Sequence, residues 1–255
     1  MASFSSLVPA RLAPALALLV ACGDVNKESP DAAVLPDAAV TIDAAVLADA
    51  PPAEGCDPAT VLPTNYRPIP MMSAGAVTVT TTAEVTSGSI DATAGGLAAS
   101  AENPYIYVNL ATGAKAALTD LEARTSTTWD IALKRSSLRI NGGDSGAGGR
   151  TLAIVAAGSL AEVTAAPATG YIADDFATAD CTLETLPGGE PKTAFGEWYG
   201  YDEVTHALMP KPEVYVIERG DGRRTAFRLL TYYGDPASSM RGAFYRAEWK
   251  QLPAR

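Results

Sequence analysis

The chain has 255 residues, of which 47% are hydrophobic and 19% are charged, and its formal net charge is −10. This acidic balance argues against a nucleic-acid partner, because neutralising phosphates requires a basic surface. The sequence contains one histidine, His206, so it excludes a histidine-based metal cluster and leaves one residue for any Ser-His-Asp or Cys-His mechanism.

The N-terminal segment is typical of an export signal. Residues 1–21 contain one charge, Arg11, followed by an apolar run that is too short to span a bilayer. The run ends in Leu19-Val20-Ala21-Cys22-Gly23, which resembles the bacterial lipobox, where the cysteine is acylated and becomes the first mature residue. We therefore expect a lipoprotein signal peptide over 1–21 and lipidation at Cys22; an ordinary secretory signal is the alternative. Gly23 in place of an aspartate favours the outer over the inner membrane.

Residues 22–62 read as a disordered acidic linker. The unit Asp-Ala-Ala-Val recurs at residues 31, 37 and 43 with a period of six, and prolines interrupt the segment. A solenoid would need long aliphatic or aromatic side chains for a stacked core, and the segment has few. A like-charged, proline-rich tether between the membrane and the domain explains the composition better.

Two cysteines remain once Cys22 is assigned to lipid. Cys56 and Cys181 are an even pair in an exported chain, for which a disulfide is the expected state. A redox role would need a nearby resolving cysteine, and neither residue has one.

The remaining residues, 63–255, predict a single antiparallel all-β domain. Runs rich in β-branched and aromatic residues are separated by glycine-rich turns. The helical candidates are short, at 114–123 and 158–166. Residues 219–223, Arg-Gly-Asp-Gly-Arg, predict a hairpin turn, because glycine supplies the positive φ of a tight reversal. The predicted strands are 77–82, 105–110, 129–134, 138–140, 214–218, 227–233 and 244–250.

Three stretches invite a catalytic or metal-binding interpretation, and each has a simpler one. Gly143-Asp-Ser-Gly146 carries the letters of a trypsin-like nucleophile, but His206 lies 61 residues downstream of the serine, so we expect a turn. Residues 142–149 lack the Gly-Lys-Ser/Thr ending of a phosphate loop. The pairs Asp174-Asp175 and Asp202-Glu203 lack the alternating ligands of a calcium loop, so we expect solvated loop charges. We therefore expect no catalytic residues and no enzyme.

Several motifs together resemble the HmuY-like family of haem-binding lipoproteins, over about residues 75–252. The most specific are the Trp129-Asp130 strand with the following Asn141-Gly142-Gly143 turn, and the run from Tyr201-Asp202 through Thr205-His206 to Val214-Tyr215-Val216. The resemblance implies an exported, lipid-anchored all-β domain that holds haem in a cleft for haem and iron acquisition. The best-known members hold the iron with two histidines, and this chain departs from them in having one.

Each of these matching residues also has a purely structural interpretation. Trp129 is expected to pack in the core, Asp130 to cap a turn, and the Asn-Gly-Gly letters only to bend the chain.

The resemblance makes haem the expected cofactor and gives candidate site residues. His206 is the first candidate for the iron, since imidazole is a common axial ligand. Met209 is too near in sequence to reach the opposite face of the ring, so Met71, Met72 or Met240 would be the second ligand, or the iron would be five-coordinate. No other metal is expected. Tyr199, Tyr201 and Tyr215, with Tyr232 and Tyr233, could line the pocket or simply cover a sheet face.

The sequence therefore favours an outer-membrane lipoprotein, facing the periplasm or the cell surface, that binds haem or a related porphyrin. Its further partners would be the membrane, through the lipid, and a haem-donor protein or an outer-membrane receptor. The competing hypothesis is a structural or adhesive surface domain of the same fold that does not bind haem.

Overall fold

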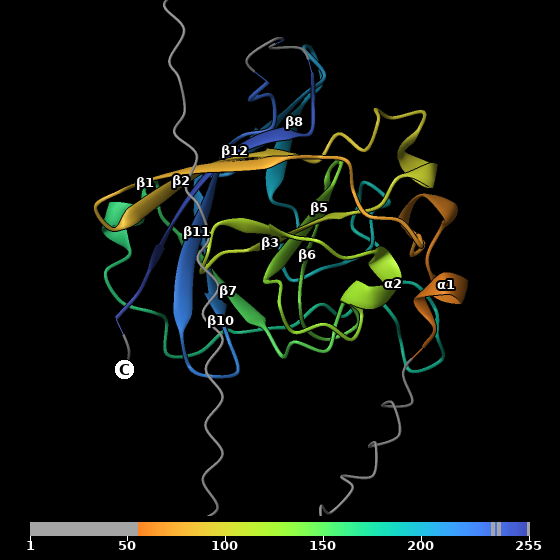
Figure 1. The fold of residues 1–255 in the computed structure, drawn as a ribbon, viewed down its shortest axis with the longest axis horizontal. Helices are drawn as coiled ribbons and strands as arrows, with labels where there is room; N and C mark the ends of the chain where they lie inside the picture. Colours follow the sequence, from red (N-terminus) through yellow and green to blue (C-terminus); the bar gives the residue numbers. More distant parts are fainter. Residues whose placement is uncertain (1–55, 236–237, 239–240, 254–255) are drawn as a thin grey trace, which may run out of the picture. The chain divides into compact units, whose positions relative to one another are not determined.

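A computed structural model describes residues 56–235, 238 and 241–253. The signal segment, Cys22, most of the linker and Met240 lie outside this part. The described chain folds into β-strands with only short helices, and the paired strands within its sheets are antiparallel (Figure 1). The predicted all-β antiparallel class is confirmed.

The larger sheet has six strands in the order β1-β2-β12-β11-β10-β7. Alternate residues of β10 point to opposite faces, as the period of a strand requires: Tyr215 and Ile217 enter the main core, while Val214 and Val216 enter a second cluster. The bounds are β1 Val77–Thr82, β2 Val85–Asp91, β12 Phe244–Gln251, β11 Arg224–Thr231, β10 Glu213–Glu218 and β7 Thr151–Ala156.

Strand β2 was not predicted from the sequence, because it reads as polar and contains Gly88. The structure gives a packing reason for that glycine. A Cβ atom at Gly88 would lie 2.5 Å from the Trp249 ring of neighbouring β12, so only glycine leaves room for the indole.

The smaller sheet has four strands, β4 (Ala114–Ala116), β3 (Ile106–Asn109), β5 (Ile131–Lys134) and β6 (Ser137–Ile140), in that order. One face, with Val108, Ile131 and Leu133, joins the core of the larger sheet. The other face carries Tyr105, Tyr107, Trp129 and Ala132. Trp129 is fully buried, which confirms its predicted place in the core.

Short helices lie beside this smaller sheet. Helix α1 (Pro58–Val61) and helix α2 (Asp120–Ala123) are neighbours on one side of it, and Arg124 after α2 pairs with Asp57 before α1 at 3.5 Å (Figure 1). The helical candidates reduce to short pieces: 114–123 holds β4 and the single turn α2, and 158–166 holds one 3-10 turn, Leu160–Glu162.

Two predicted connections are present in the structure. Residues 219–223 form the β10–β11 hairpin turn, where Arg219 N donates to Arg223 O at 2.9 Å and Gly222 has φ +79°. Cys56 and Cys181 form the predicted disulfide, with a Cα–Cα distance of 5.3 Å. Residues 56–62 of the expected linker are ordered, with Leu62 buried. Among the described helices, none is long and apolar enough to cross a membrane.

Candidate functional site

His206 lies in a small hairpin that the sequence analysis did not predict. Strand β8 (Tyr199–Asp202) pairs with strand β9 (Ala207–Pro210), and residues 203–206 connect them. The Asp202 side chain accepts hydrogen bonds from the backbone N–H groups of Val204 and Thr205, which holds the turn and keeps the pKa of Asp202 below its usual value. The backbone of His206 is left-handed, with φ +56°. The turn therefore presents an exposed imidazole at its end.

One nitrogen of that imidazole has a partner. Nδ1 lies 2.6 Å from the hydroxyl of Tyr201, across the hairpin. Within the described part of the chain, Nε2 has no hydrogen-bond partner, so it is the nitrogen that remains for a ligand. The tyrosine contact fixes the orientation of the ring, as partners of ligating histidines commonly do.

The imidazole opens onto a cleft of about 280 Å³, called here the His206 cleft. Four segments far apart in sequence meet there: residues 65–66, residues 97–100, the β5–β6 turn, and the hairpin with the end of β11. The lining residues are Asn65, Tyr66, Leu97, Ser100, Lys134, Arg135, Ser136, His206, Leu208, Tyr232 and Tyr233.

Part of the lining is aromatic and apolar. Tyr232 and Tyr233 pack edge to face, with ring centroids 5.0 Å apart, and the Tyr233 hydroxyl accepts a hydrogen bond from Leu208 N at 3.1 Å. Burial raises the pKa of Tyr232 to about 12, so the ring stays neutral. This part of the cleft can stack on a flat, apolar ligand.

Two cations also line the cleft, Lys134 and Arg135, from the end of β5. Lys134 is 1% exposed, and its Nζ has no hydrogen-bond partner among the described residues. Burial lowers the pKa of Lys134 to about 8; the negative charge of Asp120 opposes this shift and the positive charge of Arg139 adds to it. A buried ammonium without a partner is costly and therefore marks the cleft as a place for an anion.

Of the five tyrosines considered for the pocket, the structure places two in the lining of the His206 cleft. Tyr199 is half-buried and donates to Glu190 at 3.1 Å, and Tyr201 points outward, 54% exposed, with its hydroxyl on His206. Tyr215 packs in the core against Phe195, with ring centroids 5.0 Å apart, and does not line the cleft. Tyr232 and Tyr233 do.

None of the three described methionine candidates lines the His206 cleft. Met209 is exposed on β9, one residue beyond Leu208, so it lies on the opposite face of the hairpin from the cleft. Met71 and Met72 are exposed, and Met72 forms a bridge with Thr119. Met240 lies outside the described residues.

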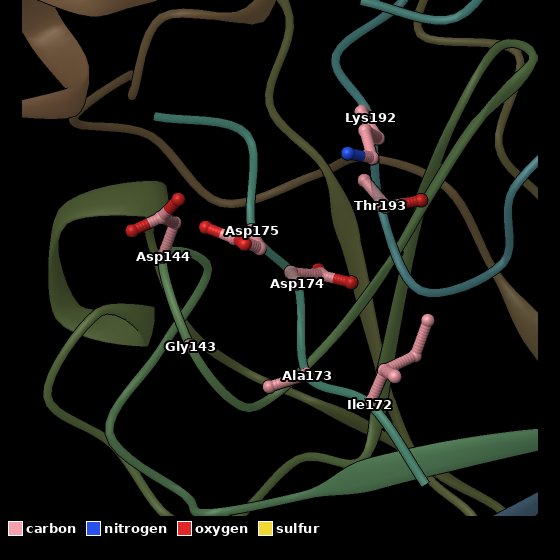
Figure 2. A pocket seen from close by; sticks show the side chains of 8 residues that line it. All are labelled: Gly143, Asp144, Ile172, Ala173, Asp174, Asp175, Lys192 and Thr193. Atoms are coloured by element: carbon pink, nitrogen blue, oxygen red, sulfur yellow. The ribbon is translucent and has the colours of Figure 1, made fainter. Parts of the chain in front are cut away.

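A larger cavity of about 550 Å³ contains none of the candidate ligands. Figure 2 shows its lining, with Asp144, Asp174, Asp175 and Lys192 around one opening. The sequence analysis expected Asp174 to be solvated, and this was wrong, because its side chain is 1% exposed and bonded to backbone. Asp174 accepts from Ile140 N at 3.0 Å and Ala194 N at 2.8 Å, and burial raises its pKa to about 6.

Asp144, which lines the same cavity, also accepts hydrogen bonds from backbone N–H groups. Its carboxylate accepts from Phe176 N at 2.8 Å and Ala177 N at 2.9 Å. These carboxylates hold loops in place. No group of three His, Cys, Asp or Glu side chains that could hold a metal ion occurs among the residues described here.

The sequence analysis missed Tyr66, Lys134 and Arg135 as cleft residues. The alternation of β5 places Lys134 on the face opposite Ile131 and Leu133, which reads as a solvent face. That face is covered by the segment around Tyr66, which no periodicity in β5 could indicate. The one sequence feature that could have indicated a buried cation was a lysine at the end of an otherwise apolar run.

One family model matches more than half of the chain. The HmuY protein family matches residues 101–244 of the chain. Among solved structures, the apo HmuY analogue of Tannerella forsythia matches with a TM-score of 0.47 and 17% identity over 69% of this chain and 97% of that one.

Two further solved structures are similar. A Bacteroides vulgatus protein proposed to be an HmuY-like haem-binding protein has a TM-score of 0.43 and 19% identity over 66% of this chain and 91% of that one. A proposed lipoprotein of Bacteroides fragilis has a TM-score of 0.45 and 18% identity over 68% and 94%. No curated protein matches the chain.

Proposed function

Because this chain belongs to the HmuY family, we propose that it binds haem, as cargo, in the His206 cleft. The observation that carries the proposal is the meeting of an imidazole, two tyrosines packed edge to face and two cations in one cleft, from segments far apart in sequence. Haem supplies an iron that accepts an axial nitrogen, a flat apolar ring and two carboxylates.

The residues of the cleft match these three features. His206 has Nε2 free for the iron while Nδ1 is held by Tyr201. Tyr232 and Tyr233 offer ring surface, and Lys134 offers an unpartnered cation. The cleft of about 280 Å³ is at the lower limit of ligand pockets, which hold roughly 300–1,000 Å³. We therefore expect one edge of the porphyrin to remain outside, beside the exposed turn at 203–206.

Met71 and Met72 do not line the cleft, so the second axial position is proposed to go to Met240, which lies outside the described residues, or to stay open. Met209 is unsuited, because it lies on the other face of the β8–β9 hairpin. A His/Met pair would raise the reduction potential of the iron relative to two histidines.

The test is a haemin titration of the purified protein, followed by absorption and electron paramagnetic resonance. We expect a Soret shift that saturates at one equivalent. His206→Ala should lower the affinity at least about tenfold and change the spin state, since an axial ligand is lost. Met209→Leu is the matched control on the same hairpin and should behave as wild type.

Two outcomes would count against this assignment. Wild-type spectra from His206→Ala would remove His206 as a ligand. Featureless, non-saturating titration of the wild-type protein would reject haem binding and favour the structural or adhesive surface domain.

We also propose that the protein is anchored to the outer membrane through Cys22 and works in haem and iron acquisition, passing haem between a donor protein and a receptor. The support is the lipobox at 19–23 and the acidic linker that follows it. Residues 1–21 would be removed, and the part of the linker before the ordered residues 56–62 would space the domain from the membrane. Cys22→Ser should move the protein to the soluble fraction or leave its signal peptide uncleaved, and unchanged detergent-phase partitioning would contradict the anchor.

A further inference from the structure

We infer that the Lys134 end of the His206 cleft binds a ligand carboxylate, so that the protein selects porphyrins with free acid side chains over neutral ones. This inference rests on the proposed function and names the chemistry by which the cleft distinguishes its ligands. It concerns Lys134 and Arg135, which the sequence motifs did not single out.

The first argument is that Lys134 has no acceptor of its own. Its Nζ is buried and lacks a hydrogen-bond partner among the described residues, and it lies 5.5 Å from the centroid of the Tyr105 ring. A cation–π contact of this kind offsets only part of the cost of desolvating an ammonium. The group therefore has hydrogen-bonding capacity left for a ligand.

The second argument is that the nearest acid is already engaged. Asp120 accepts hydrogen bonds from Ile69 N at 3.1 Å, Tyr105 N at 3.0 Å and the Tyr107 hydroxyl at 2.8 Å. It acts on Lys134 through its charge and forms no hydrogen bond with it. Arg139, which also faces this region, adds positive charge and stacks on Tyr105 at 4.3 Å.

The third argument is the charge of the cleft lining. Among the described residues, Lys134 and Arg135 line it and no carboxylate does, although the formal net charge of the chain is −10. Arg135 has a buried Nε without a partner among the described residues, and the hydrogen bond that its Nη1 donates to Gly242 O is long, at 3.4 Å. Glu190, which contacts the lining residue Ser136, already accepts hydrogen bonds from Ser136 and Tyr199. The lining therefore attracts an anion, and a carboxylate can accept from both cations.

The experiment compares a porphyrin diacid with its neutral ester on the intact protein. Metal-free protoporphyrin IX and its dimethyl ester are titrated against wild type, Lys134→Met and Lys192→Met, with quenching of tryptophan fluorescence as the readout. Metal-free ligands separate recognition of the carboxylate from ligation of the iron. Methionine keeps the length of the lysine without its charge, and Lys192, an exposed lysine paired with Glu184, is the matched control.

We expect wild type to bind the diacid about 10- to 100-fold more tightly than the ester, the range for one charge-assisted hydrogen bond. Lys134→Met should lose that preference, because it weakens binding of the diacid and leaves binding of the ester unchanged. Lys192→Met should keep the preference. Because the substitution removes a buried, unpartnered charge, Lys134→Met should fold, and circular dichroism verifies this.

The failure of the inference and of the proposed function are distinguishable. If wild type binds haemin but binds diacid and ester equally, or if Lys134→Met keeps the preference, then carboxylate recognition by Lys134 is wrong and haem binding stands. If wild type binds neither haemin nor either porphyrin, both are wrong.

Discussion

Asp174 ties three segments of the domain together through one buried carboxylate. One of its oxygens accepts from Ala194 N and the other from Ile140 N at the end of β6. Burial raises the pKa of this group to about 6, although the two backbone hydrogen bonds oppose the shift. The negative charge of Asp174 therefore lowers the stability of the fold, while its two carboxylate oxygens stabilise it by accepting the backbone hydrogen bonds.

Asp174→Asn tests this balance. The folded pKa of about 6 lies above the unfolded value of 3.8, so the folded state binds the proton more tightly. The resulting contribution to stability is full below about pH 4 and is lost as the pH rises to about 6. An asparagine does not titrate, so its stability should lack this decline. It also has one acceptor oxygen in place of two, which should lower the free energy of unfolding at pH 4 by about 1–3 kcal/mol.

The measurement is the melting temperature from pH 3 to 7 by calorimetry. Asp175→Asn, which alters the exposed neighbour, is the control and should keep the wild-type profile. An identical pH slope in wild type and Asp174→Asn would show that Asp174 is not the titrating group.

The β8–β9 hairpin is the element that carries His206, and few hydrogen bonds fix it to the rest of the domain. The hydroxyl of Tyr233, just beyond β11, accepts from Leu208 N in β9. At the base of the hairpin, Lys211 N donates to Trp198 O. Tyr199 in β8 also donates to Glu190. Strand β9 next to His206 is therefore held in part by the Tyr233 hydroxyl, and the position of the imidazole depends on this bond.

Tyr233→Phe should loosen this hairpin without disturbing the core. Loss of one hydrogen bond costs about 1 kcal/mol, which corresponds to a roughly fivefold rise in local opening. Hydrogen–deuterium exchange of peptides covering 199–210 should accelerate by about that factor. Haemin affinity should fall with it, because the imidazole is less well positioned.

Tyr201→Phe is the control for this experiment. It removes the hydroxyl on His206 Nδ1 and leaves the backbone bond of Leu208 in place. Its exchange over 199–210 should match wild type. Equal exchange in Tyr233→Phe and wild type would contradict the proposed anchoring of the hairpin.

At the scale of the whole molecule, the Cys56–Cys181 disulfide joins the start of the described domain to a loop 125 residues away. Closing a loop of that length stabilises the fold by about 4–5 kcal/mol in the chain-entropy model. It also fixes residues 56–62. These residues precede the segment around Tyr66, which covers the face of β5 that carries Lys134.

A Cys56→Ser/Cys181→Ser double variant should therefore unfold at a clearly lower denaturant concentration than wild type. The expected loss is up to about 4–5 kcal/mol in the free energy of unfolding, measured by guanidinium titration followed by tryptophan fluorescence. Wild type in reductant is the control and should approach the double variant. An unchanged midpoint in both would show that the crosslink does not stabilise the domain.

The local pattern of the sequence predicted the class of the fold and the 219–223 hairpin turn, but it did not predict the β8–β9 hairpin. Strands β1, β3, β5, β6, β10, β11 and β12 were predicted from their β-branched and aromatic residues, and the 219–223 turn from its glycines. Strand β2 was missed because the reason for its glycine is a contact with Trp249, far along the chain. Asn141 was predicted only to bend the chain; in fact its buried side chain bonds Ser126 O, Trp129 O and Gly148 N.

The candidate site divides in the same way. His206 could be chosen from composition, since it is the one histidine, and the disulfide from an even pair of cysteines in an exported chain. Periodicity assigns side chains to alternate faces of a strand, but it does not indicate which distant segment covers each face. Long-range packing buries Lys134 and Asp174 and places Tyr215 in the core. It also brings Lys134, His206 and Tyr233 together in one cleft. These features therefore became visible only in the folded chain.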